Sequence, residues 1–274
     1  LSYADPERTA FAAHHWQQHC AGIKGRQGGF QVGENGVEPL RLGVQAAAWA
    51  GMPVMVHIAN GVPVDQVLSL LRSGDIVTHC YQGTGDGVVD DSGAVVAEVW
   101  AARERGVLFD LGHGGGSFDY GVAISALANG FLADVISTDL HASSWDSPIE
   151  SMPETASKLL NLGVSFERVV HQSTTAAAGA IGRADELGTL RVGTVADLAA
   201  FEMLQGAFEF ADVRGRRERG NRKIEPVLTV REGKVYRPED LDEELRADRE
   251  RAQWMKKVTG KDFAGLGWTP GATL

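Results

Sequence analysis

The chain has 274 residues, of which 43% are hydrophobic and 23% are charged, with a formal net charge of −10. This composition is ordinary for a globular protein, and the negative charge disfavours partners such as nucleic acids and anionic membranes. No apolar run approaches the ~20 residues that span a bilayer, and the first residues lack the basic and apolar regions of a signal peptide. The sequence therefore predicts a globular, cytoplasmic protein that binds neither nucleic acid nor membranes.

Helix-like and strand-like segments alternate up to about residue 170, which is typical of a parallel α/β sheet or barrel. Helices are predicted at 6–20, 38–50, 63–72, 93–105, 118–129, 153–162 and 166–170. Strands are predicted at 21–24, 54–58, 75–80, 107–111 and 134–139. These are five strand–helix units, whereas a closed (β/α)8 barrel contains eight.

The pattern changes after residue 186 to short extended pieces separated by turn glycines, which predicts a small β domain. The extended pieces are 188–193, 197–201, and a hairpin of 224–230 with 234–236. Residues 214–223 carry six cations, and we interpret them as a solvated loop joining two strands because no aromatic residues alternate with the cations. Residues 238–257 predict a charged helix with acids early and cations late, followed by a glycine-rich tail.

Four residues of metal-ligand type stand at the downstream ends of predicted strands. They are Lys24, His57, His79 and Asp139. Each has an ordinary alternative by itself: a lone histidine is commonly a core or loop residue, and a lone lysine lies along the surface. However, the carboxyl ends of parallel barrel strands converge on one face, so the joint placement predicts a single shared site.

The order Lys, His, His, Asp, with a later Gly-Thr-Leu-x-Val-Gly-x-x-Ala-Asp-Leu segment, resembles the amidohydrolase superfamily. The segments Gly-Ile-Lys, Thr-His-Cys-Tyr-Gln-Gly, Gly-His-Gly-Gly-Gly-Ser-Phe and Ser-Thr-Asp-Leu-His are similar to its dihydroorotase-like branch, particularly the deacetylase or aminoacylase-like members. The resemblance covers residues from about 20 to 240. It implies an α/β fold, with the C-terminal five strands of a TIM barrel in 1–185, a small β-sandwich segment in 186–237, and a charged helix and tail in 238–274.

The resemblance also implies a ligand set. Lys24 would be N-carboxylated and bridge two divalent metals, with zinc expected, because a carbamate supplies the anionic oxygens that an ammonium lacks. His57 and His79 would hold the second metal, and Asp139 would bind the first metal and transfer protons. Such a zinc-dependent amidohydrolase cleaves an amide or ester of an acylated small molecule by metal-activated hydroxide.

Further candidates follow the predicted strands. His113, in a glycine-rich segment, is a candidate catalytic residue that would donate to a substrate carboxylate or oxyanion. Tyr81, Gln82, Ser117 and His141 are candidate substrate-binding residues, and His141 also fits a supporting position behind a ligand. The alternative for each is an ordinary loop residue.

None of the eight histidines forms a His-x-His pair, which would be the first pair of ligands in this kind of site. The chain also begins at Leu1 rather than Met. We therefore expect a further barrel segment or a second chain to complete the barrel, and the open sheet edges predict a homo-oligomer. A rival hypothesis is a catalytically incomplete pseudoenzyme or subunit fragment that serves assembly, and an alternative enzyme is a dihydroorotase-type cyclic amidase.

Overall fold

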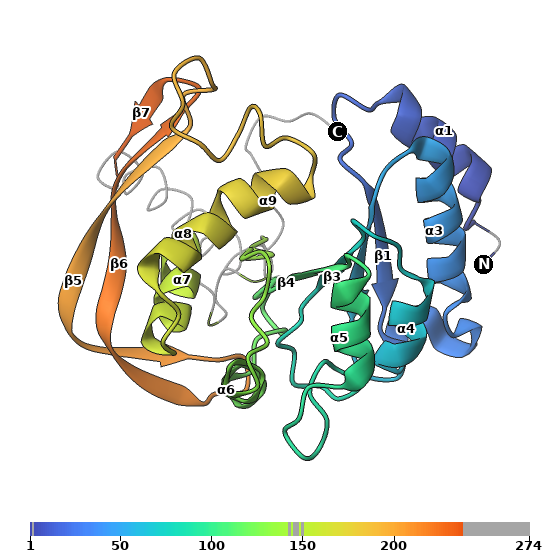
Figure 1. The fold of residues 1–274 in the computed structure, drawn as a ribbon, viewed down its shortest axis with the longest axis horizontal. Coiled ribbons are helices and arrows are strands. Elements are labelled where there is room, and N and C mark those ends of the chain that lie inside the picture. Colours follow the sequence, from blue (N-terminus) through green and yellow to red (C-terminus); the bar gives the residue numbers. More distant parts are fainter. Residues whose placement is uncertain (2, 142–143, 145–147, 149–150, 238–274) are drawn as a thin grey trace, which may run out of the picture.

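The computed structural model describes residues 1, 3–141, 144, 148 and 151–237, which form two sheets with helices around and between them. A parallel sheet has the strand order β1-β2-β3-β4, and an antiparallel sheet has the order β5-β6-β7. Figure 1 shows the parallel sheet and its helices in one half of the molecule, the long antiparallel strands in the other, and α7 to α9 between them. The α/β class predicted from the sequence is confirmed.

The parallel strands follow one another in chain order. They are β1 (Ile23–Gln27), β2 (Val54–Ile58), β3 (Ile76–Thr78) and β4 (Leu108–Asp110). The fifth predicted strand, 134–139, lies beside β4 but forms only one isolated parallel bridge, between Asp110 and Val135. Backbone hydrogen bonds from Leu111 N to Val135 O (3.0 Å) and from His113 N to Ser137 O (3.1 Å) extend the pairing. The segment therefore occupies the predicted position without a regular ladder.

The helices agree with the predicted order and differ in length. They are α1 (Pro6–His15), α2 (Gly29–Val32), α3 (Glu38–Ala50), α4 (Val64–Leu70), α5 (Ala97–Glu104), α6 (Tyr120–Ala128), α7 (Met152–Asn161), α8 (Phe166–Ser173) and α9 (Thr175–Ala180), with a 3-10 helix η1 (Gly33–Asn35). α3 has its predicted bounds because Gly51, with a φ of 67°, ends it in the left-handed conformation. α1 ends at His15, earlier than predicted, and α2, η1 and α9 were not predicted.

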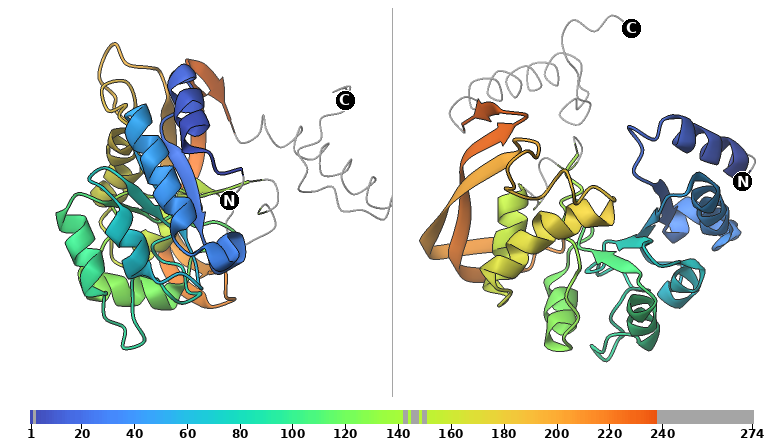
Figure 2. Two further views of the ribbon diagram at one scale, coloured as in Figure 1. Left: turned by 90° about the vertical axis from the view of Figure 1, so that its right-hand side faces the viewer. Right: turned by 45° about the horizontal axis from the view of Figure 1, so that its top comes forward.

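The core lies between the parallel sheet and the helices outside it. The alternation along β2 buries Val54, Val56 and Ile58 in this core and turns His57 to the opposite face. Leu40 of α3 is also part of the core. The right-hand view of Figure 2 shows the helices in an arc around the parallel strands. The alternation of side chains thus places His57 on the face of the sheet opposite to the helices, which is the inner face of a (β/α)8 barrel.

The antiparallel sheet consists of β5 (Leu198–Ala211), β6 (Arg217–Arg231) and β7 (Lys234–Tyr236). The hairpin of β6 and β7 confirms the predicted hairpin, but residues 188–193 are not a strand. The prediction of a loop at 214–223 was wrong for residues 217–223, which belong to β6. Cross-strand pairing explains the difference, since Arg217 forms an ion pair with Glu209 of β5 at 2.5 Å.

Helix α7 is attached to β6 by side-chain hydrogen bonds. Asn161 Nδ2 donates to Arg222 O (2.7 Å), and Asn161 Oδ1 accepts from Asn221 N (3.0 Å). Ser157 Oγ accepts from Ile224 N at 2.8 Å. Because these bonds use backbone groups of β6, the helix and the strand are expected to move as one unit.

Some sequence predictions stay open. The described residues show one antiparallel sheet, so a second layer of a β-sandwich and the domain limits 1–185 and 186–237 stay predictions. The predicted charged helix and tail at 238–274 lie outside the described residues. Within the described part of the chain, no helix has the length and apolarity needed to cross a membrane.

Candidate functional site

Strand register builds a row of polar side chains across the parallel sheet. Arg26 pairs with His57, His57 with Thr78, and Thr78 with Asp110. Partners in a parallel ladder share one face, so these four side chains lie side by side on the face opposite to the helices. Lys24 belongs to the next row, where it pairs with Met55. The expectation that Lys24 ends its strand was wrong, because β1 continues to Gln27.

His57 and His79 are adjacent at the carboxyl ends of β2 and β3. Their ring centroids are 4.5 Å apart and their planes meet at 79°. Burial, followed by the neighbouring His79, lowers the pKa of His57 to about 3, and burial is also the main cause that lowers the pKa of His79. Both rings are therefore neutral at pH 7, the form in which imidazole binds a metal.

The orientation of His79 is determined by a backbone carbonyl. Its Nδ1 lies 2.6 Å from Gly112 O. Because a carbonyl only accepts hydrogen bonds, Nδ1 carries the hydrogen and Nε2 presents a lone pair. Asp139 Oδ2 lies 3.9 Å from this Nε2. Two acceptors thus lie close together, an arrangement that a nearby cation would stabilise.

Both of these residues have unusual backbone conformations. His79 has a φ of 71° and Asp139 a φ of 47°, in the left-handed region. Non-glycine residues seldom adopt this region, although His and Asp do so more often than most. Such conformations gather at functional sites, where surrounding contacts hold them in place. Their occurrence at two of the four predicted ligands supports a functional role for this end of the sheet.

Lys24 is within electrostatic range of two carboxylates. Lys24 is exposed as a residue, but burial around its amine is the main cause that lowers its pKa, while Asp139 and then Asp110 act to raise it. A lowered pKa favours the free amine, the form that can take up carbon dioxide as a carbamate. The structure therefore places His57 beside His79 and His79 near Asp139, with Lys24 within electrostatic range of Asp139, and the ligand roles of these four residues stay predictions.

Asp110 was not predicted as a site residue. It is buried, and its Oδ2 accepts from Thr78 Oγ1 (2.6 Å) and Ser137 Oγ (2.8 Å). Its Oδ1 has no hydrogen-bond partner among the described residues. Burial raises the pKa of Asp110, and Lys24 opposes that shift. Its position near the end of the predicted strand 107–111, like those of the predicted ligands, was the signal that could have identified it.

His113 is fully buried, with both ring nitrogens engaged. Nδ1 lies 2.9 Å from Gly114 O, and Nε2 lies 2.9 Å from Nζ of the buried Lys158 in α7. The ring stacks on Phe118 with centroids 4.8 Å apart. Burial, followed by Lys158, lowers the pKa of His113 to about 3. His113 is therefore held within the structure by Gly114 and Lys158, and its catalytic role stays a prediction.

The other candidates occupy varied environments. Tyr81 is buried in the core, where its hydroxyl accepts from Ala133 N at 2.9 Å. Gln82 holds its own loop, since its Nε2 donates to Gly85 O at 2.8 Å. Ser117 is half-buried in the glycine-rich segment, and His141 is exposed with its backbone N donating to Ser144 Oγ at 3.0 Å. Tyr81 thus packs in the core rather than beside His57 and His79, and the substrate-binding roles of these residues stay predictions.

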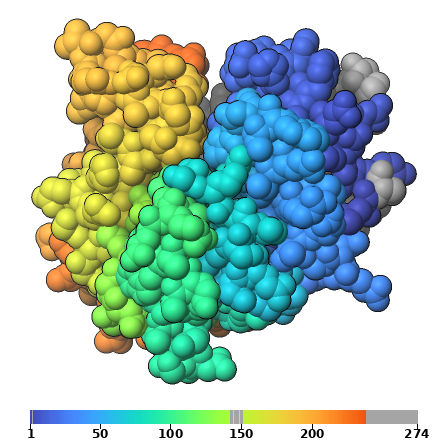
Figure 3. All heavy atoms as spheres, turned by 45° about the vertical axis from the view of Figure 1, so that its right-hand side comes forward, coloured from blue at the N-terminus to red at the C-terminus, as the bar shows by residue number. Residues whose placement is uncertain are grey.

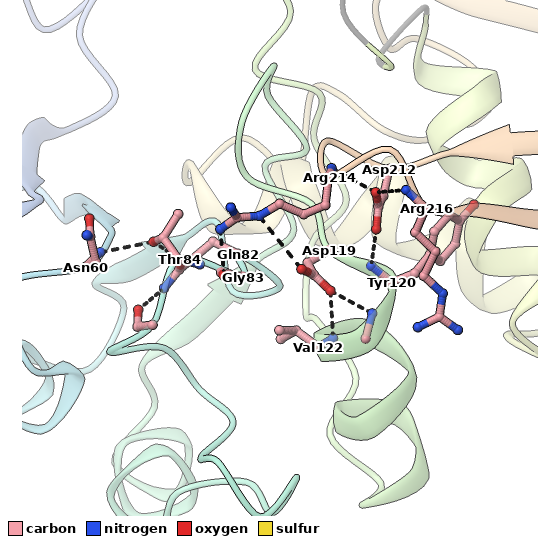
Figure 4. A network of polar contacts seen from close by, with 12 residues as sticks. Asn60, Gln82, Gly83, Thr84, Asp119, Tyr120, Val122, Asp212, Arg214 and Arg216 are labelled. Carbon is pink, nitrogen blue, oxygen red and sulfur yellow. Dashed lines mark hydrogen bonds and ion pairs between the residues drawn. The ribbon is translucent and has the colours of Figure 1, made fainter.

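The turn between β5 and β6 forms hydrogen bonds with the loops that follow β3 and β4 (Figure 4). The buried Asp212 accepts from Tyr120 N through Oδ2 (3.0 Å) and from Arg214 N and Arg216 N through Oδ1 (2.8 and 2.9 Å). Arg214 donates to Gly83 O at 2.6 Å and lies 3.9 Å from Asp119. The antiparallel sheet therefore helps to hold the loops that carry His79 and His113.

A cavity of about 580 Å³ lies at the amino ends of the strands, away from His57 and His79 at the carboxyl ends. Its walls come from the segments before β1, β2 and β3 and from 180–182 after α9. Figure 3 shows the furrow between the N-terminal segment, in blue, and the segment around α9, in yellow. Its lining residues lie before the strands or at the end of α9 and do not include the candidate ligands, so the cavity is separate from the candidate site. Arg72 and Asp75 in its wall pair with each other at 2.8 Å.

Comparison with known proteins finds similar proteins of one superfamily. The sequence model of the Amidohydrolase family matches residues 121–235. A solved structure described as an adenine deaminase has a TM-score of 0.80 at 31% identity, over 83% of this chain and 63% of its own. A dihydroorotase structure has a TM-score of 0.77 at 34% identity, over 85% and 62%. With the Lys, His, His, Asp arrangement, these matches support a protein similar to members of the amidohydrolase superfamily.

Within the superfamily, the curated relatives are deacetylases. A deacetylase of Agrobacterium fabrum is 37% identical over 215 residues, which are 78% of this chain and 52% of that protein. The chain therefore spans about half the length of this relative. The likeness to deacetylases agrees with the resemblance seen in the sequence.

Proposed function

We propose that the protein that contains this chain is a metal-dependent hydrolase, with zinc as the metal, that removes an acyl group from a small molecule by cleaving an amide or ester. The observation that carries the proposal is the pair of His79 Nε2 and Asp139 Oδ2, two acceptors that face each other at 3.9 Å. Two such acceptors repel unless a cation or a proton lies between them. The deacetylases among its relatives support the choice of reaction.

The donor set fits a divalent metal in part. His57 and His79 supply neutral imidazole nitrogens, and Asp139 supplies a carboxylate. No group of three or more His, Cys, Asp and Glu side chains within the described residues is arranged to hold a metal. A carbamate on Lys24, which lies beside Asp139 and Asp110, would add the oxygen ligand that such a group lacks.

Different residues of the chain would have different roles in hydrolysis. A bound divalent metal would supply Lewis acidity and make water acidic enough to ionise near neutral pH. Gly112 O would keep Nε2 of His79 aimed at the site. Asp139, the most exposed carboxylate of the group, would accept the proton of the attacking water and return it to the leaving group.

Hydrolysis of a cyclic amide is the second candidate function. The dihydroorotase structure that matches 85% of this chain at 34% identity favours it. Both candidate reactions cleave a carbon–nitrogen or carbon–oxygen bond at a carbonyl, so the same residues would serve either reaction. The two differ in whether the leaving group stays attached to the product.

The test measures bound metal and hydrolysis on the same preparations. Purified protein is analysed by plasma mass spectrometry and assayed for acetate release from N-acetyl and O-acetyl acids, and for opening of dihydroorotate. We expect bound zinc and acetate release in the wild type and loss of both in His79→Ala and Asp139→Ala. His14→Ala, an exposed histidine of α1, is the matched control. If the protein binds no metal after incubation with zinc and hydrolyses none of the substrates, the proposal is refuted and the scaffold hypothesis is favoured.

A further inference from the structure

Lys158 is a lysine in the interior of the protein. It belongs to α7, and its side chain is only 1% exposed. Its Nζ lies 2.9 Å from Nε2 of His113, 2.7 Å from Pro148 O and 3.1 Å from Oε1 of Glu154. Lysine is seldom fully buried, because its charge must be taken out of water and paired. A buried cation that contacts a histidine of the glycine-rich loop requires an explanation.

The contact with Lys158 fixes the tautomer of His113. An ammonium group only donates hydrogen bonds, so Nε2 of His113 accepts from Lys158. The ring therefore carries its hydrogen on Nδ1, which donates to Gly114 O at 2.9 Å. One face of the ring stacks on Phe118, with centroids 4.8 Å apart, and Lys158 Nζ lies 5.8 Å from the centroid of that phenyl ring. The imidazole is thus held at both nitrogens and on one face.

The glycines on either side of His113 touch two of the candidate ligands. Gly112 O accepts from His79 Nδ1 at 2.6 Å. A Cβ on Gly114 would lie 3.2 Å from Asp139 Oδ2, so this carboxylate lies against the backbone of Gly114. Both glycines have a positive φ, of 51° and 53°. Because a glycine has no side chain to anchor it, the side chain of His113 between them attaches this stretch of backbone to α7.

We propose that Lys158 is a positioning residue for His79. By donating to Nε2 of His113, it holds the backbone at the place where Gly112 O orients the ring of His79. The inference rests on the proposed hydrolase function and extends the candidate site to α7, where nothing in the sequence distinguishes Lys158 from a surface lysine. Lys158 itself touches neither metal nor substrate and acts through His113.

The first test measures histidine tautomers by NMR in metal-free protein whose histidines are labelled with nitrogen-15. In the wild type we expect His113 and His79 to carry their hydrogen on Nδ1. Lys158→Met keeps an unbranched stem and removes the donor, so it should abolish this preference at His113 and weaken it at His79, whereas Lys158→Arg should retain it. Ser157→Ala is the matched control, because it removes a bond from the same helix to Ile224 N and leaves Lys158 in place. An unchanged His79 in Lys158→Met, or an equal change in Ser157→Ala, would overturn the inference.

The second test measures zinc affinity by competition with a chromophoric chelator. In Lys158→Met we expect the Kd for zinc to rise about 10-fold, as for other residues that orient a ligand. The kcat for acetate release should fall with KM little changed, because Lys158 does not touch the substrate. In a His113→Gln background, Lys158→Met should change the Kd by less than about 2-fold, since both substitutions break the same link. Effects that add in the double variant would contradict a role through His113.

The NMR measurement needs neither zinc nor substrate, so it separates this inference from the proposed function. A His79 tautomer that depends on Lys158, in a protein that neither binds zinc nor hydrolyses any acetyl probe, would refute the hydrolase and support the link. Zinc binding and hydrolysis with His79 unaffected by Lys158→Met would overturn the inference and keep the hydrolase. If Lys158→Met does not fold, His113→Gln decides, and a His79 that keeps its full preference for Nδ1 in that variant would overturn the inference.

Discussion

Gly112 is the residue on which the orientation of His79 depends. Its carbonyl accepts from His79 Nδ1 at 2.6 Å, and its own φ is 51°. A Cβ at this position would collide with Thr78 Oγ1 and approach His79 Nδ1 to 2.9 Å. The glycine therefore serves two purposes, because it permits the left-handed turn and leaves room for the histidine ring.

We predict that Gly112→Ala destabilises the protein by about 2–4 kcal/mol, as the sum of a left-handed alanine and a steric clash. Gly116→Ala, in the same loop, is the matched control because a Cβ there has no neighbour within 4 Å. It should stay within about 1 kcal/mol of the wild type. Denaturant unfolding measures both variants, and equal stability of the two would contradict the assigned role of Gly112.

Lys24 permits a test of the proposed carbamate. Lys24→Ala should lose most of the acetate release and part of the bound metal, and short carboxylic acids such as acetate or propionate should restore part of the metal because they replace the missing oxygen ligand. Lys223→Ala, which removes a surface lysine paired with Glu225, serves as the control. Unchanged turnover and metal content in Lys24→Ala would show that Lys24 is an ordinary strand residue.

At the scale of elements, the joint of α7 and β6 links the two sheets. Asn161 makes bonds with four backbone groups of β6 or α7, among them Arg222 O at 2.7 Å and Asn221 N at 3.0 Å. On the same helix, Lys158 reaches His113 at 2.9 Å. Helix α7 therefore connects the antiparallel sheet to the glycine-rich loop beside the candidate ligands.

We predict that Asn161→Ala costs about 1–3 kcal/mol, because it leaves backbone groups of β6 without their partners. Hydrogen exchange should accelerate first at Asn221 and Arg222. Asn35→Ala, whose amide donates to the nearby Val32 O, is the control with little expected effect. A uniform change in exchange across the whole chain, without a local increase in β6, would argue against the joint.

At the scale of the whole molecule, His113 makes stability depend on pH. Its native pKa is about 3, whereas an unfolded histidine titrates near 6.5. Below pH 6.5 the unfolded chain therefore binds a proton that the native protein does not bind, and the free energy of unfolding falls as the pH falls toward 3. The full contribution of His113 is present above pH 6.5.

The expected slope for His113 is up to ~1.4 kcal/mol per pH unit between these two values. Denaturant unfolding at pH 7, 6, 5 and 4.5 measures the slope, and His113→Gln should reduce it although this variant is less stable at pH 7. A slope in His113→Gln equal to that of the wild type would assign the acid sensitivity to other groups.

The sequence by itself determined the order of the parallel strands and the placement of His57, His79 and Asp139 at the carboxyl ends of predicted strands. Strand periodicity and turn residues are local signals, and the polarity of a parallel sheet then places the strand ends on one side. The end of α3 at Ala50 followed from Gly51 for the same reason. These features need no knowledge of distant contacts.

Only the tertiary structure decided the rest. The basic run at 217–223 became part of β6 because acids on β5, such as Glu209, lie opposite to it. Lys158 was indistinguishable in the sequence from a surface lysine of a helix, and packing against His113 and Phe118 buried it. Arg26 joined the ligand row through its register with His57. Burial, register and pairing depend on residues far apart in the chain, and no local pattern encodes them.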